Sequence, residues 1–136
     1  MDKKYAGKAV YEAQMEELRN NHRQWKEERR SQKTPFFMIY KDFKDIYLKD
    51  ISGGALKLYV YLGFHVNSFT GECWISTENI ADFFGNDQRT VKKWISELEE
   101  IGLIRRIQNG FKRVANTFIL PYLKDTDSSE QEDDLS

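Results

Sequence analysis

The sequence of 136 residues is long enough for one domain with a hydrophobic core and too short for a large enzyme with several lobes. Hydrophobic residues make up 40% of the chain and charged residues 32%, and no apolar run approaches the length of a membrane span, which excludes a wholly disordered chain and a membrane protein. The net charge of -1 hides an asymmetry, because residues 124–136 carry one base and six acids and leave +4 for residues 1–123. We therefore expect a mildly basic folded part and a disordered acidic tail, which solubilises the protein or shields its basic face.

The N-terminus and the cysteine content indicate the compartment. Met1-Asp2-Lys3-Lys4 is not followed by an apolar stretch, so no signal peptide is expected. The single Cys73 cannot form an internal disulfide. These features predict a soluble, cytoplasmic protein.

After a frayed start at residues 1–8, a helix is predicted over residues 9–30, because this segment lacks Gly and Pro and is rich in strong helix formers. Heptad-like spacing aligns an apolar stripe, which consists of Tyr11, Met15, Leu18, His22 and Trp25. The helix either covers the domain or a protein partner as an ordinary amphipathic arm, or pairs with its own copy in a homodimer. Two heptads are too few to pair without further contacts. The dimerisation candidates are Tyr11, Met15, Leu18 and Trp25.

Residues 31–35 are predicted to form a linker, because Pro35 disfavours helical geometry at Thr34. A basic patch surrounds this junction and consists of Lys26, Arg29, Arg30 and Lys33. These charges fit either a solvated helix C-terminus or a phosphate contact.

The next segment supplies cover for the core. Residues 36–40 are apolar and aromatic, which predicts a strand or an extended segment. Residues 41–49 predict a turn or two of helix. Ser52 is placed to cap a helix that runs to about residue 67 with a broad apolar face. The two glycines after this cap lack the surroundings of a phosphate-binding loop.

Two short helices joined by a tight turn follow. Ser76 is predicted to cap the first, Gly85 to end it in the left-handed conformation, and Asp87 to cap the second over residues 88–101. The buried face of the second helix is predicted to carry Val91, Trp94, Ile95, Leu98 and Ile101. Its opposite face is polar and partly basic.

The strands complete an α+β domain. After a turn at residues 67–71, residues 72–75 predict a short strand, and residues 103–108 with 111 (or 116) to 120 predict a hairpin at Asn109-Gly110. A two-residue turn there would pair Arg106 with Arg113, which is unfavourable unless the loop is longer or phosphate relieves the repulsion. The predicted assembly is a three-stranded antiparallel sheet against three helices.

Ala81, Gly85 and Val91 fall at the spacing of a helix-turn-helix motif. Together with residues 71–76, 88–91 and 98–104, they resemble bacterial winged helix-turn-helix proteins of the kind found in plasmid and phage replication initiators and small transcriptional regulators. The resemblance covers roughly residues 36–122. It implies a three-helix core with a three-stranded antiparallel sheet and an extra N-terminal helix. The domains expected are a helical arm at 1–34, a winged helix at 35–123 and the tail at 124–136.

The resemblance also implies sequence-specific binding of double-stranded DNA, with the helix from residue 88 in the major groove. Gln88 and Arg89 are candidates for base edges, and the phosphate candidates are Thr90, Lys92, Lys93 and Ser96. The wing, residues 105–116, is expected on the backbone or in the minor groove, and its candidates are Arg105, Arg106, Lys112 and Arg113. The process served is transcriptional regulation, or plasmid or phage replication or maintenance. The alternative is a winged-helix protein–protein interaction module without DNA readout.

Catalysis has little support in the sequence. His22 and His65 fall in separate helices, and Cys73 is expected to be a buried strand residue. No Cys/His cluster has the spacing of metal ligands, and no Ser/His/Asp arrangement is suggested. We expect no enzymatic activity, no cofactor and no metal site.

Overall fold

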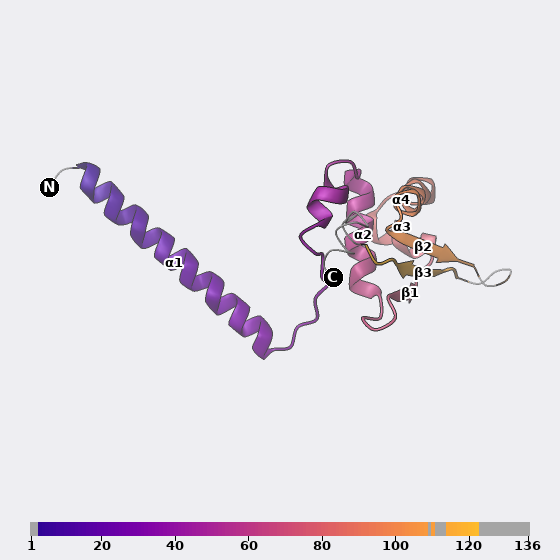
Figure 1. Cartoon of the computed structure of the whole chain (residues 1–136), viewed down its shortest axis with the longest axis horizontal. Helices are drawn as coiled ribbons and strands as arrows, with labels where there is room; N and C mark the ends of the chain where they lie inside the picture. Colours follow the sequence, from indigo (N-terminus) through magenta and orange to yellow (C-terminus); the bar gives the residue numbers. More distant parts are fainter. Residues whose placement is uncertain (1–2, 109, 111–113, 123–136) are drawn as a thin grey trace, which may run out of the picture. The chain divides into compact units, whose positions relative to one another are not determined.

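The computed structural model describes residues 3–108, 110 and 114–122, with side chains from residue 7 onward. The chain divides into two compact units, which we call unit 1 (Met1–Phe36) and unit 2 (Phe37–Ser136). Unit 1 contains the helix α1 (Lys3–Ser31). Unit 2 contains the π-helical turn η1 (Lys44–Leu48), α2 (Gly53–His65), β1 (Glu72–Trp74), α3 (Thr77–Phe84), α4 (Gln88–Glu100), β2 (Ile104–Ile107) and β3 (Asn116–Ile119) (Figure 1).

The helix α1 begins earlier than the sequence predicts. Residues 3–8, which were expected to fray, are helical, because a single glycine at position 7 costs only about 1 kcal/mol between good helix formers. The helix ends in a Schellman motif, in which the N–H of Thr34 donates to the carbonyl of Arg29 and that of Lys33 to Arg30. Lys33 adopts the left-handed conformation (φ 52°) that glycine usually fills at this position.

The strand that residues 36–40 suggest does not form, and residues 34–40 have no regular secondary structure. Within unit 2, the Phe37 ring instead packs edge-on against Tyr59 at 5.4 Å and lies where a side chain at Gly63 would be. The segment is held at a second point by the backbone N–H of Tyr40, which donates to the hydroxyl of Tyr122 (2.8 Å). Phe37 thus covers part of the core of unit 2, whereas Met38, Ile39 and Tyr40 are exposed.

The caps predicted for α2, α3 and α4 are confirmed. Ser52 Oγ accepts the N–H of Ala55 at the start of α2, and Ser76 Oγ accepts that of Asn79 at the start of α3. Gly85 closes α3 with φ 68°. Such caps satisfy N–H groups that have no partner inside the helix, which fixes where each helix starts.

The three strands form one antiparallel sheet in the order β1-β3-β2. Arg106 pairs with Thr117 and Ile107 with Asn116, so residues 108–115 separate the last paired residues of the hairpin. The two-residue turn, which would pair Arg106 with Arg113, is therefore wrong, and the longer loop with a last strand that begins at Asn116, the other possibility that the sequence left open, is confirmed. The register of β3 is also fixed by β1, because Trp74 pairs with the same Asn116.

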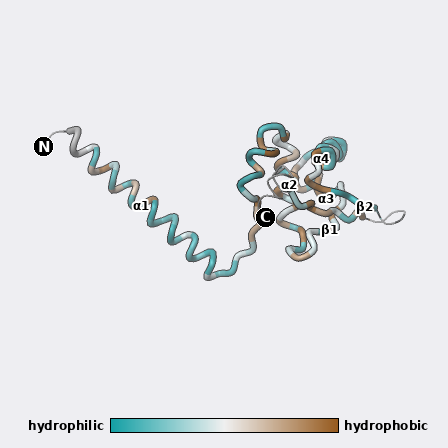
Figure 2. Tube along the Cα trace, in the orientation of Figure 1, coloured by the Kyte–Doolittle hydropathy of each residue, from teal (hydrophilic) through white to brown (hydrophobic). Residues whose placement is uncertain are grey.

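The core of unit 2 lies between the helices and the inner face of this sheet. Its buried hydrophobic residues are Phe43, Ala55, Leu58, Tyr59, Leu62, Cys73, Ile80, Ala81, Val91, Ile95, Leu98, Leu103 and Ile104. Both α2 and α3 pack against α4, which in turn packs against β2. In Figure 2 the apolar residues of α2 contrast with the largely hydrophilic trace of α4. The predicted order of helices and strands is confirmed.

Within the described residues, no helix combines the length and apolarity that crossing a membrane requires. Across the same part of the chain, no group of three His, Cys, Asp or Glu side chains is arranged to hold a metal ion.

Candidate nucleic-acid interface

The two faces of α4 differ sharply in burial. Val91 and Leu98 are fully buried, and Ala81 of α3, which packs against α4, is buried too. On the opposite face, Arg89, Lys92 and Lys93 are exposed. The helix is thus anchored by one side and exposes the other, as the spacing of its apolar residues predicts.

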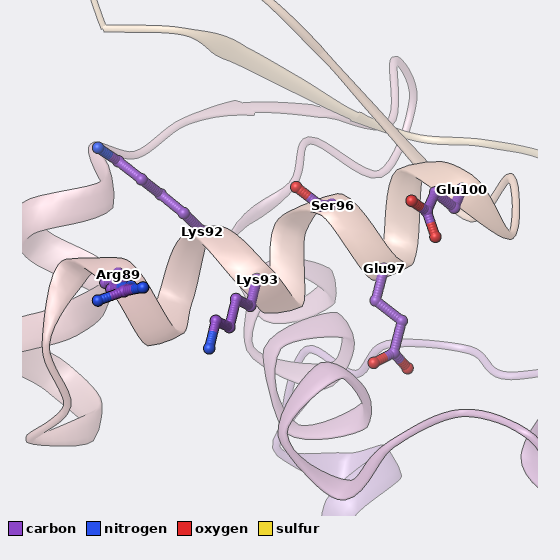
Figure 3. Close-up of a pocket in the computed structure, with 6 residues that line it drawn as sticks. All are labelled: Arg89, Lys92, Lys93, Ser96, Glu97 and Glu100. Atoms are coloured by element: carbon purple, nitrogen blue, oxygen red, sulfur yellow. The ribbon is translucent and has the colours of Figure 1, made fainter.

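The exposed face of α4 is shallowly hollowed, with a volume of about 510 Å³ (Figure 3). Its lining residues are Arg89, Lys92, Lys93, Ser96, Glu97 and Glu100. The cations occupy the first half of the helix and the carboxylates the second. The side chains of Lys92 and Lys93 point to different sides of the helix in Figure 3, so the positive charge spreads across its N-terminal half. Gln88 is exposed at the helix start.

The N-terminus of α4 is fixed by Asp87. Its Oδ1 accepts the backbone N–H of Thr90 (2.7 Å). Hydrogen bonding from Thr90, with the nearby charge of Lys93, lowers the pKa of Asp87 below its ordinary value, so the cap is ionised at neutral pH. Thr90 is half-buried and engaged in this cap.

Two contacts that the sequence did not reveal fix α4 against α2. The Glu97 carboxylate accepts the backbone N–H of Ser52 (2.7 Å), so a residue of α4 satisfies a donor at the start of α2. The Trp94 indole occupies the space a side chain at Gly54 would need, since a Cβ there would lie 2.0 Å from Nε1. No local pattern signals either contact, because the partners are far apart in sequence.

Lys57 of α2 also lies near this helix pair. Its ammonium group is 5.6 Å from the centre of the Phe84 ring and 5.8 Å from that of Trp94. Lys57 is exposed and adds a cation near the end of α3 and the middle of α4, which sequence reasoning missed.

The neighbouring arginines of β2 lie on opposite faces of the sheet. Arg105 is exposed on the outer face, whereas Arg106 is half-buried on the inner face. The Nη1 of Arg106 donates to Thr117 Oγ1 (2.8 Å) and to the carbonyl of Ile75 (3.3 Å). Burial lowers the pKa of Arg106 somewhat, and Glu99 opposes this effect. The guanidinium thus links β2, β3 and the segment before α3.

Cys73 is buried on the same inner face, as predicted. Burial raises the pKa of its thiol, and the nearby charge of Arg106 opposes the shift only in part. His65 is exposed and lies against the Tyr61 ring at 4.5 Å. Neither residue lines the hollow on α4.

Several sequence predictions concern other parts of the chain. Lys112, Arg113 and the acidic tail at 124–136 lie outside the described residues. In unit 1, Tyr11, Leu18 and Trp25 are each more than half exposed, and Met15 is half-buried.

The positive charge is shared unequally between the two units. Residues 1–36 contain nine bases and six acids, whereas residues 37–123 contain eleven bases and ten acids. Most of the +4 therefore belongs to unit 1, and the basic character of the α4 face comes from local placement of a few cations.

Comparison with known proteins identifies the region around these helices. Residues 49–104 match a family of helix-turn-helix domains. Among curated proteins no match is found.

Among solved structures, the chain is similar to a chain of a Rep–DNA complex, with 16% identity over 79% of this chain and 92% of that one and a TM-score of 0.51. It also aligns with an N-terminal domain of a DNA binding protein (16% identity, 79% and 92% coverage, TM-score 0.47) and with an MDR initiator (18%, 79% and 94%, TM-score 0.43). At 16% identity, the likeness to the first is one of fold.

The capped and packed pair α3–α4 and the three-stranded antiparallel sheet agree with both findings. Unit 2 thus has the winged helix-turn-helix fold, and residues 49–104 within it are similar to helix-turn-helix domains.

Proposed function

We propose that the chain binds double-stranded DNA in a sequence-specific way, with the first half of α4 in the major groove. The supporting observation is the cluster of Arg89, Lys92 and Lys93, exposed on a helix whose opposite face is buried. A helix fits the major groove, and the N-terminal residues of a recognition helix are those that contact base edges.

The side chains divide by chemistry. Arg89 and Gln88 have the geometry to bond guanine and adenine edges, and Lys92, Lys93 and Ser96 suit phosphates. Thr90 is half-buried and donates its backbone N–H to the Asp87 cap, so it is the least accessible of the phosphate candidates on α4. The carboxylates in the second half of the helix repel phosphate, which favours the basic half as the contact.

In the wing, Arg105, Lys112 and Arg113 are proposed to lie along the backbone or in the minor groove. Arg106 is proposed to stabilise the sheet and not to contact DNA, because its Nη1 donates to Thr117 and to the carbonyl of Ile75. The match to helix-turn-helix domains and the similarity to a chain of a Rep–DNA complex support a role in plasmid or phage replication or maintenance, or in transcriptional regulation.

A selection of bound sequences from random duplex DNA, followed by fluorescence anisotropy on the selected and a scrambled duplex, tests the proposal. Arg89→Ala should lower the preference for the selected duplex by about 5- to 150-fold, the equivalent of one bidentate base contact. Lys112→Ala should weaken both duplexes alike. Lys44→Ala, which removes an exposed lysine of η1 outside the α4 hollow, is the charge-matched control and should change neither.

A second candidate is a protein–protein interaction module. Trp74 and Ile107, which are 61% and 46% exposed, favour it, because they place apolar surface on the outer face of the sheet. Absence of any shift with DNA at low salt, together with capture of a protein partner that Trp74→Ala abolishes, would support this candidate and contradict DNA binding.

A further inference from the structure

Within the described part of unit 1, nothing covers the apolar side chains of the long helix α1. Within unit 1, all residues from 7 to 31 are exposed except the half-buried Met15. At a rise of 1.5 Å per residue the helix is about 43 Å long. An isolated helix gains most of its stability from packing an amphipathic face, so α1 needs a partner along its stripe.

The apolar stripe of α1 has the spacing of a helix-pairing interface, and we call this stripe the seam. It consists of Tyr11, Met15, Leu18, His22 and Trp25. A shallow hollow of about 510 Å³ lies along it, between Met15, Leu18 and His22. The His22 and Trp25 rings lie 5.7 Å apart at the C-terminal end of this seam. Side chains spaced in this way pack as knobs into the holes of a facing helix.

We propose that α1 pairs in antiparallel orientation with α1 of a second copy of this chain. In the arrangement that fills the seam, Met15 lies opposite Trp25 of the second copy, and Leu18 opposite His22 of the second copy. The two apolar stripes then cover one another. Two heptads are too few to hold such a pair alone, and the further contacts come from the ends and flanks of α1, which at 29 residues is longer than the predicted helix.

Charge at the ends of the stripe selects the orientation. Lys8 and Arg29 continue the heptad positions of Met15 and His22 at either end. In a parallel pair, each of these cations would meet its own copy in the seam, and like charges there are unfavourable. In the antiparallel pair, Arg29 lies over Tyr11 of the second copy, and Lys8 extends past the end of the facing helix into water.

The flanks of the seam agree with this orientation. Glu12 lies beside Lys26 of the second copy, and the two-fold symmetry repeats this pair of opposite charges. Arg19, which approaches its own copy at the centre, is partly neutralised by Glu16 of the same helix, 3.6 Å away.

The orientation has a consequence that rests on the proposed function. In the antiparallel pair the two Ser31 residues are roughly 33 Å apart along the axis, close to the 34–36 Å of one DNA turn. In a parallel pair they would be only about 10 Å apart. Residues 32–36 add up to roughly 17 Å of reach on each side. The antiparallel pair therefore suits two half-sites one turn apart.

Cross-linking of the full chain in solution tests the pairing. In a Cys73→Ala background, Glu12→Cys and Lys26→Cys chains of different tag size are mixed and treated with a short bismaleimide. The expected product is the mixed dimer, while either chain alone gives none. Cross-linking of each chain with itself would establish a parallel pair, and a monomeric mass for the uncross-linked chain would rule out pairing; both overturn the proposal.

A matched pair of substitutions separates pairing from folding. Leu18→Glu places an acid in the seam and should give a monomeric mass by light scattering, whereas Ala13→Glu, on the polar side of α1, should leave a dimer. Both should bind a single half-site as the native chain does, and only Leu18→Glu should lose the gain in affinity from a second half-site. If no duplex is bound at all, the proposed function fails, and the cross-linking still decides the pairing. A dimer that survives Leu18→Glu would contradict the seam.

Discussion

Arg105 and Arg106 are consecutive residues of the same type, and their surroundings give them different roles. The strand alternates faces, so Arg105 projects into water while Arg106 turns inward and bonds to Thr117 and to the Ile75 carbonyl. From the sequence both are equally good candidates for the DNA contact, because a run of two cations does not indicate which side chain points outward.

This difference predicts unequal costs in stability. Arg106→Ala should lower the free energy of unfolding by about 1–3 kcal/mol, because it leaves the buried Thr117 hydroxyl without its charged partner. Arg105→Ala should change it by less than about 0.5 kcal/mol, as for most exposed sites. Urea unfolding followed by circular dichroism measures both. Equal stability of the two variants would show that the bonds of Arg106 contribute nothing to folding.

The burial of Cys73 leads to a prediction about the reactivity of its thiol. Because burial raises the pKa of its thiol, little thiolate forms at neutral pH, and alkylation by iodoacetamide should be far slower than that of a free cysteine. In urea the rate should rise to the free value. The linkage has a definite sign: the unfolded chain ionises this thiol at a lower pH than the folded one. The contribution of Cys73 to the free energy of unfolding is therefore fully present below the pKa of the unfolded chain and is lost at alkaline pH.

Rapid labelling of Cys73 in the native protein at pH 7.5 would contradict its burial. The Cys73→Ala chain is the control for labelling elsewhere, and no adduct is expected on it.

Among the elements, the α3–α4 pair could be predicted almost to the residue. Ser76, Gly85 and Asp87 bond to backbone groups within three or four residues, so the helix ends that they fix can be predicted from the local sequence. The wing could not be predicted in the same way. Its register depends on the pairing of β3 with both β1 and β2, and this outweighs the local preference of Asn109-Gly110 for a tight turn.

In the candidate site, too, some features could be predicted from the sequence and others could not. Periodicity alone predicts which side chains of α4 face outward, and the structure agrees for Arg89, Lys92 and Lys93. The contacts of Glu97 and Trp94 with α2 join residues about forty positions apart, and no repeating pattern carries such information.

Substitution of Gly54 tests how strongly the position of α4 depends on its contact with α2. Gly54→Ala should destabilise unit 2 by about 1–3 kcal/mol, because the new methyl group overlaps the Trp94 indole and more than cancels the better helix propensity of alanine. Gly53→Ala is the neighbouring control. A Cβ there meets nothing within 4 Å, so stability should be unchanged or slightly higher.

Thermal melts of the two variants measure the difference. DNA affinity should fall for Gly54→Ala and not for Gly53→Ala, since only the former displaces α4. If the two variants melt together, the contact between Gly54 and Trp94 is too loose to hold the helix.

At the scale of the whole molecule, the two units are expected to respond differently to salt. If Lys92, Lys93, Arg105, Lys112 and Arg113 contact phosphates, about five counterions are released, and affinity should fall roughly 500-fold between 50 and 200 mM salt. The pairing of α1 depends mainly on apolar side chains, so the mass in solution should not change over this range. Anisotropy and light scattering on the same samples measure the two effects. A dimer that dissociates in parallel with the loss of DNA binding would contradict the division of roles.

The contact between Gly54 and Trp94 also constrains how this sequence can diverge. The two positions share one volume, so a side chain at 54 is tolerable only where residue 94 has become smaller. Among relatives of this chain, these positions should therefore covary, with glycine retained wherever the tryptophan is retained. The two residues would then be conserved together or replaced together, although they belong to different helices.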